Sequence, residues 1–290
     1  MARGLDHIVH AVSDLDAAAA FYARAGFTVG ARNVHPPAWG TQNHIVQLPG
    51  VFVELLTVAD TSGIVPHSGQ HFSFGAFNRD FLARGQGLSM LVLEGKDSAA
   101  ELEAFRAAGI GDFDLFDFSR DAKRPDGTPT RVAFTLAFAR DAAAPEIGFF
   151  TSRQHHPENF WSPAFQSHAN GAIGVAGIVL VADRPQDHRA FLSAFADVDL
   201  TSDASGITAK TPRGDIDVMQ PASFTRRFGT MPPSTAEGAR LAALRFDVKN
   251  LATPRAALRS GKISFSEQAQ RLVVDPDLAF GATLVFESAP

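Results

Sequence analysis

The sequence predicts an α+β fold in which four β-α-β-β-β modules form two curved mixed sheets. One unit, a strand followed by a single helix and then by further strands, recurs four times along the 290 residues. In each copy the helix follows the first strand at about the same offset, and no second helix interrupts the later strands. A doubly wound α/β protein would instead alternate strands and helices throughout. A generic α+β protein without a true repeat is the alternative that one sequence leaves open.

The first copy shows the unit most clearly. Its helix is expected from 17 to 25, because Asp14 or Asp16 can cap its start and Gly26 can end it. The turn dipeptide Pro49-Gly50 separates its last two strands. The strands of this copy are expected at Leu5–Val12, Phe27–Val29, Gln42–Leu48 and Val51–Val58.

The other three copies repeat the pattern. Their helices are expected at Ser98–Ala108, Gln186–Ala196 and from Asn250 to Arg259. The strands of the second copy are expected at Leu88–Leu93, Phe113–Ser119, Arg131–Ala139 and Ile147–Thr151. Those of the third and fourth copies are expected at Val175–Val181, Ile207–Lys210, Asp215–Gln220, Leu241–Val248, near Ile263, Arg271–Val274 and Ala282–Phe286.

The repeat predicts two halves. The N-terminal half, residues 1–154, holds the first two copies, and the C-terminal half, residues 175–290, holds the last two. The segment 155–174 contains Pro157, Pro163 and polar residues, which is typical of a linker between packed units.

The composition excludes several classes of function. The formal net charge is -5 and no basic stripe is present, so nucleic acid binding is not expected. No apolar run approaches the ~20 residues of a membrane-spanning helix, and no signal-peptide pattern opens the chain. We therefore expect a cytoplasmic protein without membrane contact. Because cysteine is absent, any metal ion must be bound through His, Asp or Glu.

Several short motifs carry a resemblance to a known family. They are Leu5-Asp6-His7-Ile8-Val9, Asp14-Leu15-Asp16, Phe21-Tyr22, Gly26-Phe27, and Glu54 within Val51-Phe52-Val53-Glu54-Leu55-Leu56. Together they resemble the opening module of the glyoxalase-like branch of the vicinal oxygen chelate superfamily. The resemblance is specific over roughly residues 4 to 60. It implies a double vicinal oxygen chelate architecture, in which paired modules cup a divalent metal ion that binds vicinal oxygens of a substrate. It also implies that the first and last strands supply the metal ligands, here His7 and Glu54.

The chemistry of these two residues suits that role. A neutral imidazole and a carboxylate can bind zinc, nickel, manganese or iron. Glu54 lies between apolar neighbours, and its burial without a cation or hydrogen bonds would be costly. The competing interpretations are a solvent-facing Glu54 on an edge strand and a hydrogen-bonded core histidine at His7. In the metal hypothesis, Glu54 is also the catalytic carboxylate that moves a proton.

A third ligand is expected where the second copy ends. If its last strand persists, Ser152, Gln154 and His156 lie on one side of it. His156 is the first choice, and Gln154 is the alternative. A polar His-His-Pro-Glu linker is the competing interpretation. If the first module pairs with the fourth instead of the second, Glu287 takes the position of Glu54 and becomes the reserve ligand.

The other copies lack a first-strand histidine. His7 corresponds to Ser89 or Met90, to Gly177 and to Ala243, none of which is a competent ligand. We therefore expect the first half to carry the chemistry and the second half to hold no metal through its first strands.

Other polar residues are candidates for substrate binding. Asn43 and His44 could line the cup, and Arg120 or Arg124 could bind a substrate carboxylate. The histidines interpreted as surface or linker residues are His35, His67, His71, His168 and His188.

Three functions remain open. The favoured one is a metal-dependent lyase or isomerase, in which the metal stabilises an enediolate or oxyanion. One alternative is an extradiol-type ring-cleavage dioxygenase, because two His and one Glu form the facial triad of non-haem iron. The other is a non-catalytic protein that binds a small molecule or drug in a Phe-rich cup. In each case the partner is a small molecule, and the chain is expected to be a monomer or homodimer.

Overall fold

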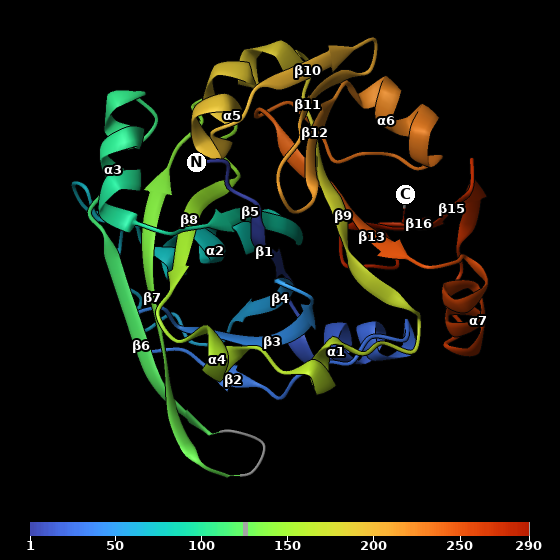
Figure 1. The fold of residues 1–290 in the computed structure, drawn as a ribbon, viewed down its shortest axis with the longest axis horizontal. Helices are drawn as coiled ribbons and strands as arrows, with labels where there is room; N and C mark the ends of the chain where they lie inside the picture. Colours follow the sequence, from blue (N-terminus) through green and yellow to red (C-terminus); the bar gives the residue numbers. More distant parts are fainter. Residues whose placement is uncertain (124–126, 290) are drawn as a thin grey trace.

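A computed structural model describes residues 1–123 and 127–289 of the chain (Figure 1). The elements of the N-terminal half are β1 (Leu5–Ala11), α1 (Leu15–Arg24), β2 (Asn33–Val34), β3 (Thr41–Leu48), β4 (Val51–Val58), α2 (Phe74–Leu82), β5 (Gly87–Glu94), α3 (Ser98–Ala107), β6 (Phe116–Lys123), β7 (Pro129–Ala139) and β8 (Gly148–Gln154). The connection contains α4 (Pro157–Phe160) and the 3₁₀ turn η1 (Pro163–Gln166).

The C-terminal half repeats this order. Its elements are β9 (Ala172–Val181), the 3₁₀ turn η2 (Pro185–His188), α5 (Arg189–Ala196), β10 (Leu200–Asp203), β11 (Gly206–Ala209), β12 (Asp215–Met219), α6 (Pro221–Phe228), β13 (Arg240–Val248), α7 (Ala252–Ser260), β14 (Ser266–Gln268), β15 (Arg271–Val274) and β16 (Thr283–Ser288). None of the helices within the described ranges is long and apolar enough to cross a membrane.

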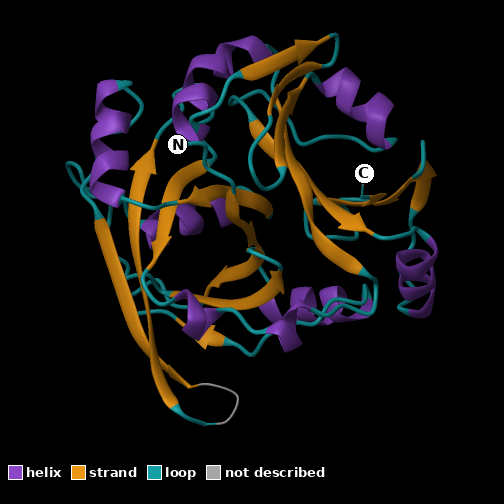
Figure 2. Ribbon diagram, in the orientation of Figure 1, coloured by secondary structure: helices purple, strands orange, loops and turns teal. Residues whose placement is uncertain are grey.

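The strands form two curved, eight-stranded mixed sheets (Figure 2). Their orders are β2-β3-β4-β1-β5-β8-β7-β6 and β10-β11-β12-β9-β13-β16-β15-β14. In every module the first strand pairs in parallel with the last strand. The first strands of two modules then pair antiparallel, β1 with β5 and β9 with β13. The predicted fold is therefore confirmed, and the first module pairs with the second.

Local chemistry explains why the helices begin and end where they do. The Asp14 carboxylate caps α1 by accepting a hydrogen bond from the Ala17 amide at 2.9 Å. The chain leaves this helix through Gly26, whose φ of +86° favours glycine. Helix α1 then buries Leu15, Ala18, Phe21 and Tyr22 against the sheet, so its apolar stripe fixes which face of the sheet it covers.

Three predicted strands lie elsewhere. The strand expected near Ile263 is at Ser266–Gln268. The second strand of the first module is at Asn33–Val34 instead of 27–29, because Phe27 is buried in the core, where its ring contacts that of Phe246 at 4.8 Å. The first strand after α3 begins at Phe116 instead of Phe113. Helices α2 and α6 were not predicted. A short apolar run in a sequence does not show whether its side chains pair along a strand or fill a core.

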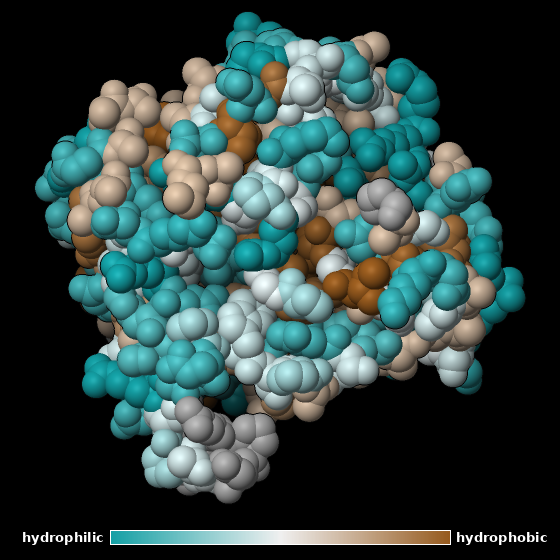
Figure 3. All heavy atoms as spheres, in the orientation of Figure 1, coloured by the Kyte–Doolittle hydropathy of each residue, from teal (hydrophilic) through white to brown (hydrophobic). Residues whose placement is uncertain are grey.

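The two halves share one hydrophobic core. A single cluster of buried residues includes side chains from both sheets and from α1, α3, α5 and α7. The rings of Phe149 and Phe191, one from each half, lie 4.7 Å apart. Hydrophilic residues cover most of the face shown in Figure 3, and hydrophobic residues on it gather toward the C-terminal half. Two smaller apolar clusters line the opposite, concave face of each sheet.

Candidate functional site

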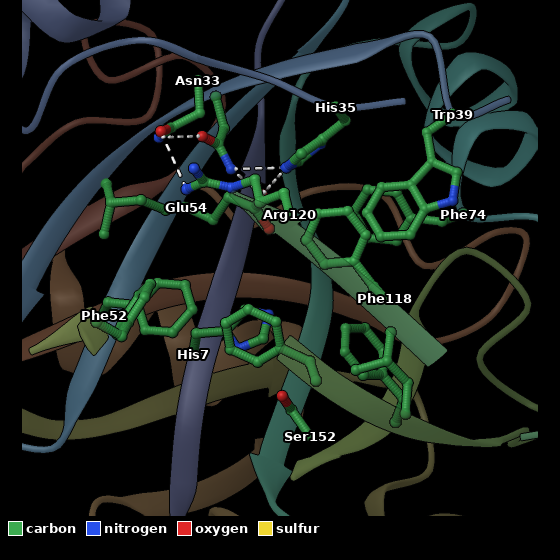
Figure 4. A pocket seen from close by; sticks show the side chains of 16 residues that line it. His7, Asn33, His35, Trp39, Phe52, Glu54, Phe74, Phe118, Arg120 and Ser152 are labelled. Atoms are coloured by element: carbon green, nitrogen blue, oxygen red, sulfur yellow. Dashed lines mark hydrogen bonds and ion pairs between the residues drawn. The ribbon is translucent and has the colours of Figure 1, made fainter. Parts of the chain in front are cut away.

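A cavity lies against the concave face of the N-terminal sheet (Figure 4). Both His7 and Glu54 line it, so the structure brings these two predicted residues to the same site. Its walls are largely aromatic. The other lining residues are Asn33, His35, Trp39, Asn43, Ile45, Phe52, Phe74, Phe118, Arg120, Phe134, Leu136, Phe150, Ser152 and Phe160.

Strand register places His7 and Glu54 on this face. His7 pairs with Phe52, and Val9 pairs with Glu54, in the parallel β1–β4 ladder. Because alternate residues of a strand share a face, His7, Phe52 and Glu54 all point into the cup. Opposite β5, however, Asp6 is an extra residue between the pairs that Leu5 and His7 make. Such a bulge lets two successive side chains lie close together.

His7 is held by this bulge. Its Nδ1 lies 2.6 Å from the Asp6 carboxylate, which also accepts a hydrogen bond from the Gln154 amide at 3.0 Å. The imidazole stacks on the Phe52 ring at 4.3 Å and meets Phe150 edge-on. Nε2 has no hydrogen-bond partner among the described residues. It is the nitrogen left for a ligand, and Asp6 fixes the ring orientation that presents it.

Glu54 is held by a chain of amides. The side-chain nitrogen of Asn43 donates to the Glu54 carboxylate at 2.5 Å. The side-chain nitrogen of Asn33 donates to the side-chain oxygen of Asn43 at 3.0 Å. The Arg120 guanidinium donates to the side-chain oxygen of Asn33 at 3.1 Å. All three hydrogen bonds run in the same direction, from the cation to the anion, so each polarises the next. This relay satisfies a carboxylate that is only 6% exposed.

His35 is a neutral member of the same cluster. Burial lowers the pKa of His35 below its usual value, although Glu54 at 3.9 Å opposes that shift. The side-chain nitrogen of Asn43 lies 3.2 Å from the His35 Nε2. Because that nitrogen can only donate, Nε2 accepts, and the ring proton is on Nδ1, which faces Thr41. The interpretation of His35 as a surface residue is therefore corrected. His168 and His188, interpreted in the same way, are also buried.

The structure places His156 outside the cavity, contrary to expectation. Strand β8 ends at Gln154, and His156 directly precedes the Pro157 that opens α4. Strand alternation therefore stops before His156. Its side chain is 45% exposed and lies 3.7 Å from Glu158. Gln154 is not a lining residue either, because its amide is bonded to Asp6.

Two other candidates also lie away from the cavity. His44 pairs with Leu55 on the opposite face of the sheet and contacts the Gly30 carbonyl at 2.7 Å, whereas Asn43 faces the cup. Glu287 belongs to the C-terminal sheet, because the first module pairs with the second and not with the fourth. Arg124 lies outside the described residues.

The register also shows which residues stand at the equivalent positions of the second module. In the antiparallel β1–β5 ladder, His7 pairs with Val92, and Val9 pairs with Met90. Exchanging the two first strands therefore places Met90 at the position of His7 and Val92 at the position of Val9. On the last strands, Val9 pairs with Glu54 in the first module, and Val92 pairs with Phe150 in the second. Phe150 is therefore the counterpart of Glu54. The first module thus carries two possible metal ligands, His7 and Glu54, whereas the equivalent positions of the second module carry the apolar Met90 and Phe150. Ser152, which does line the cavity, lies two residues beyond Phe150.

This donor set does not fit a metal ion held by three protein ligands. Catalytic zinc sites normally use three such ligands. Within residues 1–123 and 127–289, no three His, Asp or Glu side chains are grouped so as to hold a metal. The Glu54 carboxylate is already bonded to Asn43, and the module that would complete the shell contributes Met90 and Phe150 instead.

The C-terminal cup carries a network of ion pairs. Val179 pairs with Asp217 as Val9 pairs with Glu54, so Asp217 is the counterpart of Glu54. Arg245 donates to Asp217 and, at 3.1 Å, to Glu287. Both carboxylates are thus neutralised by a guanidinium within the described chain.

Sequence reasoning missed three contributors to the N-terminal site: Asp6, Asn33 and His35. Asp6 adjoins His7 in sequence, but only the bulge turns both side chains the same way. Asn33 and His35 precede the Pro36-Pro37 pair, in a stretch whose strand was assigned elsewhere. Placing β2 correctly would have put Asn33 opposite Asn43 and so revealed the relay.

Comparisons with known proteins agree with this architecture. The profile of the glyoxalase-like domain family matches residues 5–195, which is well over half of the chain. No curated protein matches the chain in sequence. Among solved structures, a hypothetical protein from Staphylococcus aureus superposes with a TM-score of 0.65 at 11% identity, covering 99% of this chain and 100% of that one.

Two structures with named functions have the same fold. A mutant of 4-hydroxymandelate synthase from Streptomyces coelicolor gives a TM-score of 0.63 at 12% identity, covering 99% of this chain and 92% of that one. The Mn(II)-bound glyoxalase from Novosphingobium aromaticivorans gives 0.56 at 11% identity, covering 99% and 83%. At such identities these likenesses show the fold alone. The family profile, the four repeated modules and the paired cups together establish that the chain belongs to the glyoxalase-like domain family of the vicinal oxygen chelate superfamily.

Proposed function

We propose that the N-terminal cup binds a small molecule with vicinal oxygens and catalyses proton transfer at one of the two carbons that carry them, as a lyase or isomerase does. The observation that carries this proposal is His7, whose Nδ1 is fixed by Asp6 while Nε2 is left for a ligand in an aromatic cavity. An imidazole with one nitrogen bonded to a carboxylate and the other facing the cavity has the arrangement of a general base.

Each residue has a defined task in this proposal. The Nε2 of His7 takes the proton from the substrate carbon, and Asp6 stabilises the imidazolium that forms. The electron pair of the broken C–H bond moves into the neighbouring carbonyl as an enolate. His7 then returns the proton to the enolate oxygen or to the adjacent carbon. In the second case the proton of the neighbouring hydroxyl also passes to the other oxygen, so that a new carbonyl and a new hydroxyl form. Glu54, in the same cavity, is the second group that can carry a proton.

The donor set does not support the metal-dependent versions of this chemistry. The expected metal-dependent lyase or isomerase, and the ring-cleavage dioxygenase, both need a third protein ligand, and His156 lies outside the cavity. We therefore assign the proton transfer to side chains of the cavity.

Binding without reaction is the second candidate. The observation that favours it is the apolar pair Met90 and Phe150 at the positions where a second module would complete a reactive site. An aromatic cavity of this kind can retain a small molecule without changing it.

Hydrogen exchange distinguishes the two candidates. Small 2-hydroxyketones are incubated with the protein in D₂O, and loss of the α-hydrogen signal is followed by NMR, with and without EDTA. We expect exchange that EDTA does not change and that H7Q slows at least ~100-fold, because general base catalysis contributes that much. H44Q, on the opposite sheet face, is the matched control and should exchange normally.

Other outcomes decide against the proposal. Exchange that persists in H7Q would place the base elsewhere. Exchange that appears only after Mn²⁺ or Zn²⁺ is added would restore the metal-dependent function. Binding of the ketones without exchange in the wild type would favour the non-catalytic protein.

A further inference from the structure

Arg120 occupies an unusual electrostatic position in the N-terminal cup. It projects from β6 on the same face as Phe118, and both residues line the cavity. Burial lowers the pKa of Arg120 below its usual value. A guanidinium that has lost part of its hydration needs compensation from an anion or from hydrogen bonds.

Other partly buried arginines of the chain have that compensation. Burial also lowers the pKa of Arg227 and of Arg240. Arg227 pairs with Asp217 at 3.3 Å, and Arg240 pairs with Glu146 at 2.5 Å. Arg120 differs, because no carboxylate among the described residues forms an ion pair with it.

The orientation of the Arg120 guanidinium is nevertheless fixed. One N–H group donates to the side-chain oxygen of Asn33 at 3.1 Å (Figure 4). The side-chain nitrogen of Asn33 in turn donates to Asn43. A guanidinium carries five N–H donors in a planar fork. The bond to Asn33 therefore leaves a pre-oriented set of donors that matches the two oxygens of a carboxylate.

The surroundings restrict what the anion can be. Among the described lining residues, Arg120 is the one permanent cation, and the Glu54 carboxylate lies in the same cavity, which disfavours a doubly charged phosphate. The aromatic walls suit an apolar body, and the cavity volume of about 80 Å³ suits a small one. These limits describe a small monocarboxylate.

We propose that Arg120 binds the carboxylate of a small organic acid, and that such acids are the substrate class of the N-terminal cup. This inference rests on the proposed function for the site itself. It adds the group by which the substrate is recognised and the end of the cavity at which that group lies.

Matched acids and amides test the inference directly. Benzoate and butyrate are titrated into the protein by calorimetry, beside benzamide and butyramide, which have nearly the same shape but no charge. The variants are R120Q and the control R131Q, which removes an exposed arginine from the neighbouring strand β7. We expect both acids to bind the wild type and R131Q alike, R120Q to raise their Kd at least tenfold, and the amides to bind weakly to all three proteins.

The contrary results are equally distinct. Equal affinity of R120Q and wild type for the acids, equal affinity of the wild type for acids and amides, or no saturable binding of either acid would each overturn the inference. If R120Q is unfolded by circular dichroism, R120K replaces it. R120K keeps the charge but loses the fork, and it should raise the Kd for the acids while leaving that for the amides unchanged.

These results are separate from the test of the proposed function. Acid binding that depends on Arg120, without α-hydrogen exchange, would uphold the inference and reject catalysis. Exchange of the 2-hydroxyketones that depends on His7, together with acid binding that R120Q leaves unchanged, would uphold catalysis and reject the inference.

Discussion

Single residues determine how the two cups of this fold differ. Glu54 and Asp217 stand at equivalent positions on the last strands of the first and third modules. In the N-terminal cup the carboxylate is satisfied by an amide, and a cavity remains beside it. In the C-terminal cup the 6% exposed Arg245 reaches the equivalent carboxylate directly. The same backbone thus supports an aromatic cavity in one half and an ion-pair network in the other.

Removing Arg245 should therefore be costly to stability. We expect R245M to lower the free energy of unfolding by roughly 3 kcal/mol, because Asp217 and Glu287 lose a buried partner. Arg227 and Arg271 remain nearby and limit the loss. Urea denaturation measures the difference.

The control for Arg245 is an arginine in an exposed ion pair. R255M breaks the contact between Arg255 of α7 and Glu267 of β14, and we expect it to change stability far less than R245M does, because solvent screens an exposed ion pair. A loss in R245M no larger than that in R255M would show that the C-terminal network contributes little.

At the scale of elements, β1 serves two faces at once. Its concave face presents His7 to the cavity, and its other face presents His10 to α1 and to the C-terminal half. The Tyr22 hydroxyl lies 2.9 Å from the His10 Nδ1, and the Phe280 carbonyl lies 3.0 Å from its Nε2. Because a carbonyl can only accept, Nε2 carries the proton and Tyr22 donates to Nδ1. A neutral His10 satisfies every partner.

This neutral histidine predicts a pH-dependent stability. Burial lowers the pKa of His10 from 6.5 to about 4, so the unfolded chain binds more protons than the folded one between these values. The contribution of His10 is therefore complete above pH 6.5 and is lost as the pH falls toward 4. At pH 5 the loss should be about 2 kcal/mol.

The measurement compares urea unfolding of wild type and H10Q at pH 7 and pH 5. His35 and His168 also have pKa values lowered by burial and act in the same direction, but they are common to both proteins. The wild type should lose about 2 kcal/mol more than H10Q across this range. Equal losses in the two proteins would mean that His10 does not titrate on unfolding.

Elements differed in how well the sequence predicted them. Long periodic segments with caps, such as α1 and β4, were placed within a few residues, because spacing and Asp14 or Gly26 mark them locally. His7 and Glu54 were chosen from the family resemblance; both line the cavity, and their role there stays a prediction. His156 failed because the end of a strand depends on the residues beyond it, here Pro157. Asn33, His35 and Asp6 were missed because a two-residue strand and a bulge leave almost no periodic signal.

At the scale of the whole molecule, the two halves are joined by more than a linker. The buried Asp141 of the N-terminal half lies 2.6 Å from the Nδ1 of the buried His188 in the C-terminal half. Glu146 pairs with both Arg84 and Arg240, again from different halves. These contacts surround the shared hydrophobic core. An interface of this kind resembles the inside of one domain more than the contact between two independent domains.

We therefore expect the halves to unfold in one transition. Trp39 and Trp161 both lie on the N-terminal side of β9, so tryptophan fluorescence reports that part of the chain, whereas far-UV circular dichroism reports both sheets. The two probes should give the same urea midpoint.

The variant H188A leaves the Asp141 carboxylate without its buried partner. Both midpoints should fall together in H188A, and the free energy of unfolding should fall by roughly 2 kcal/mol. H44Q, whose histidine contacts a backbone carbonyl within one half, should lower stability less. A fluorescence midpoint that separates from the dichroism midpoint, in the wild type or only in H188A, would show that each half retains its structure when the contact between them is lost.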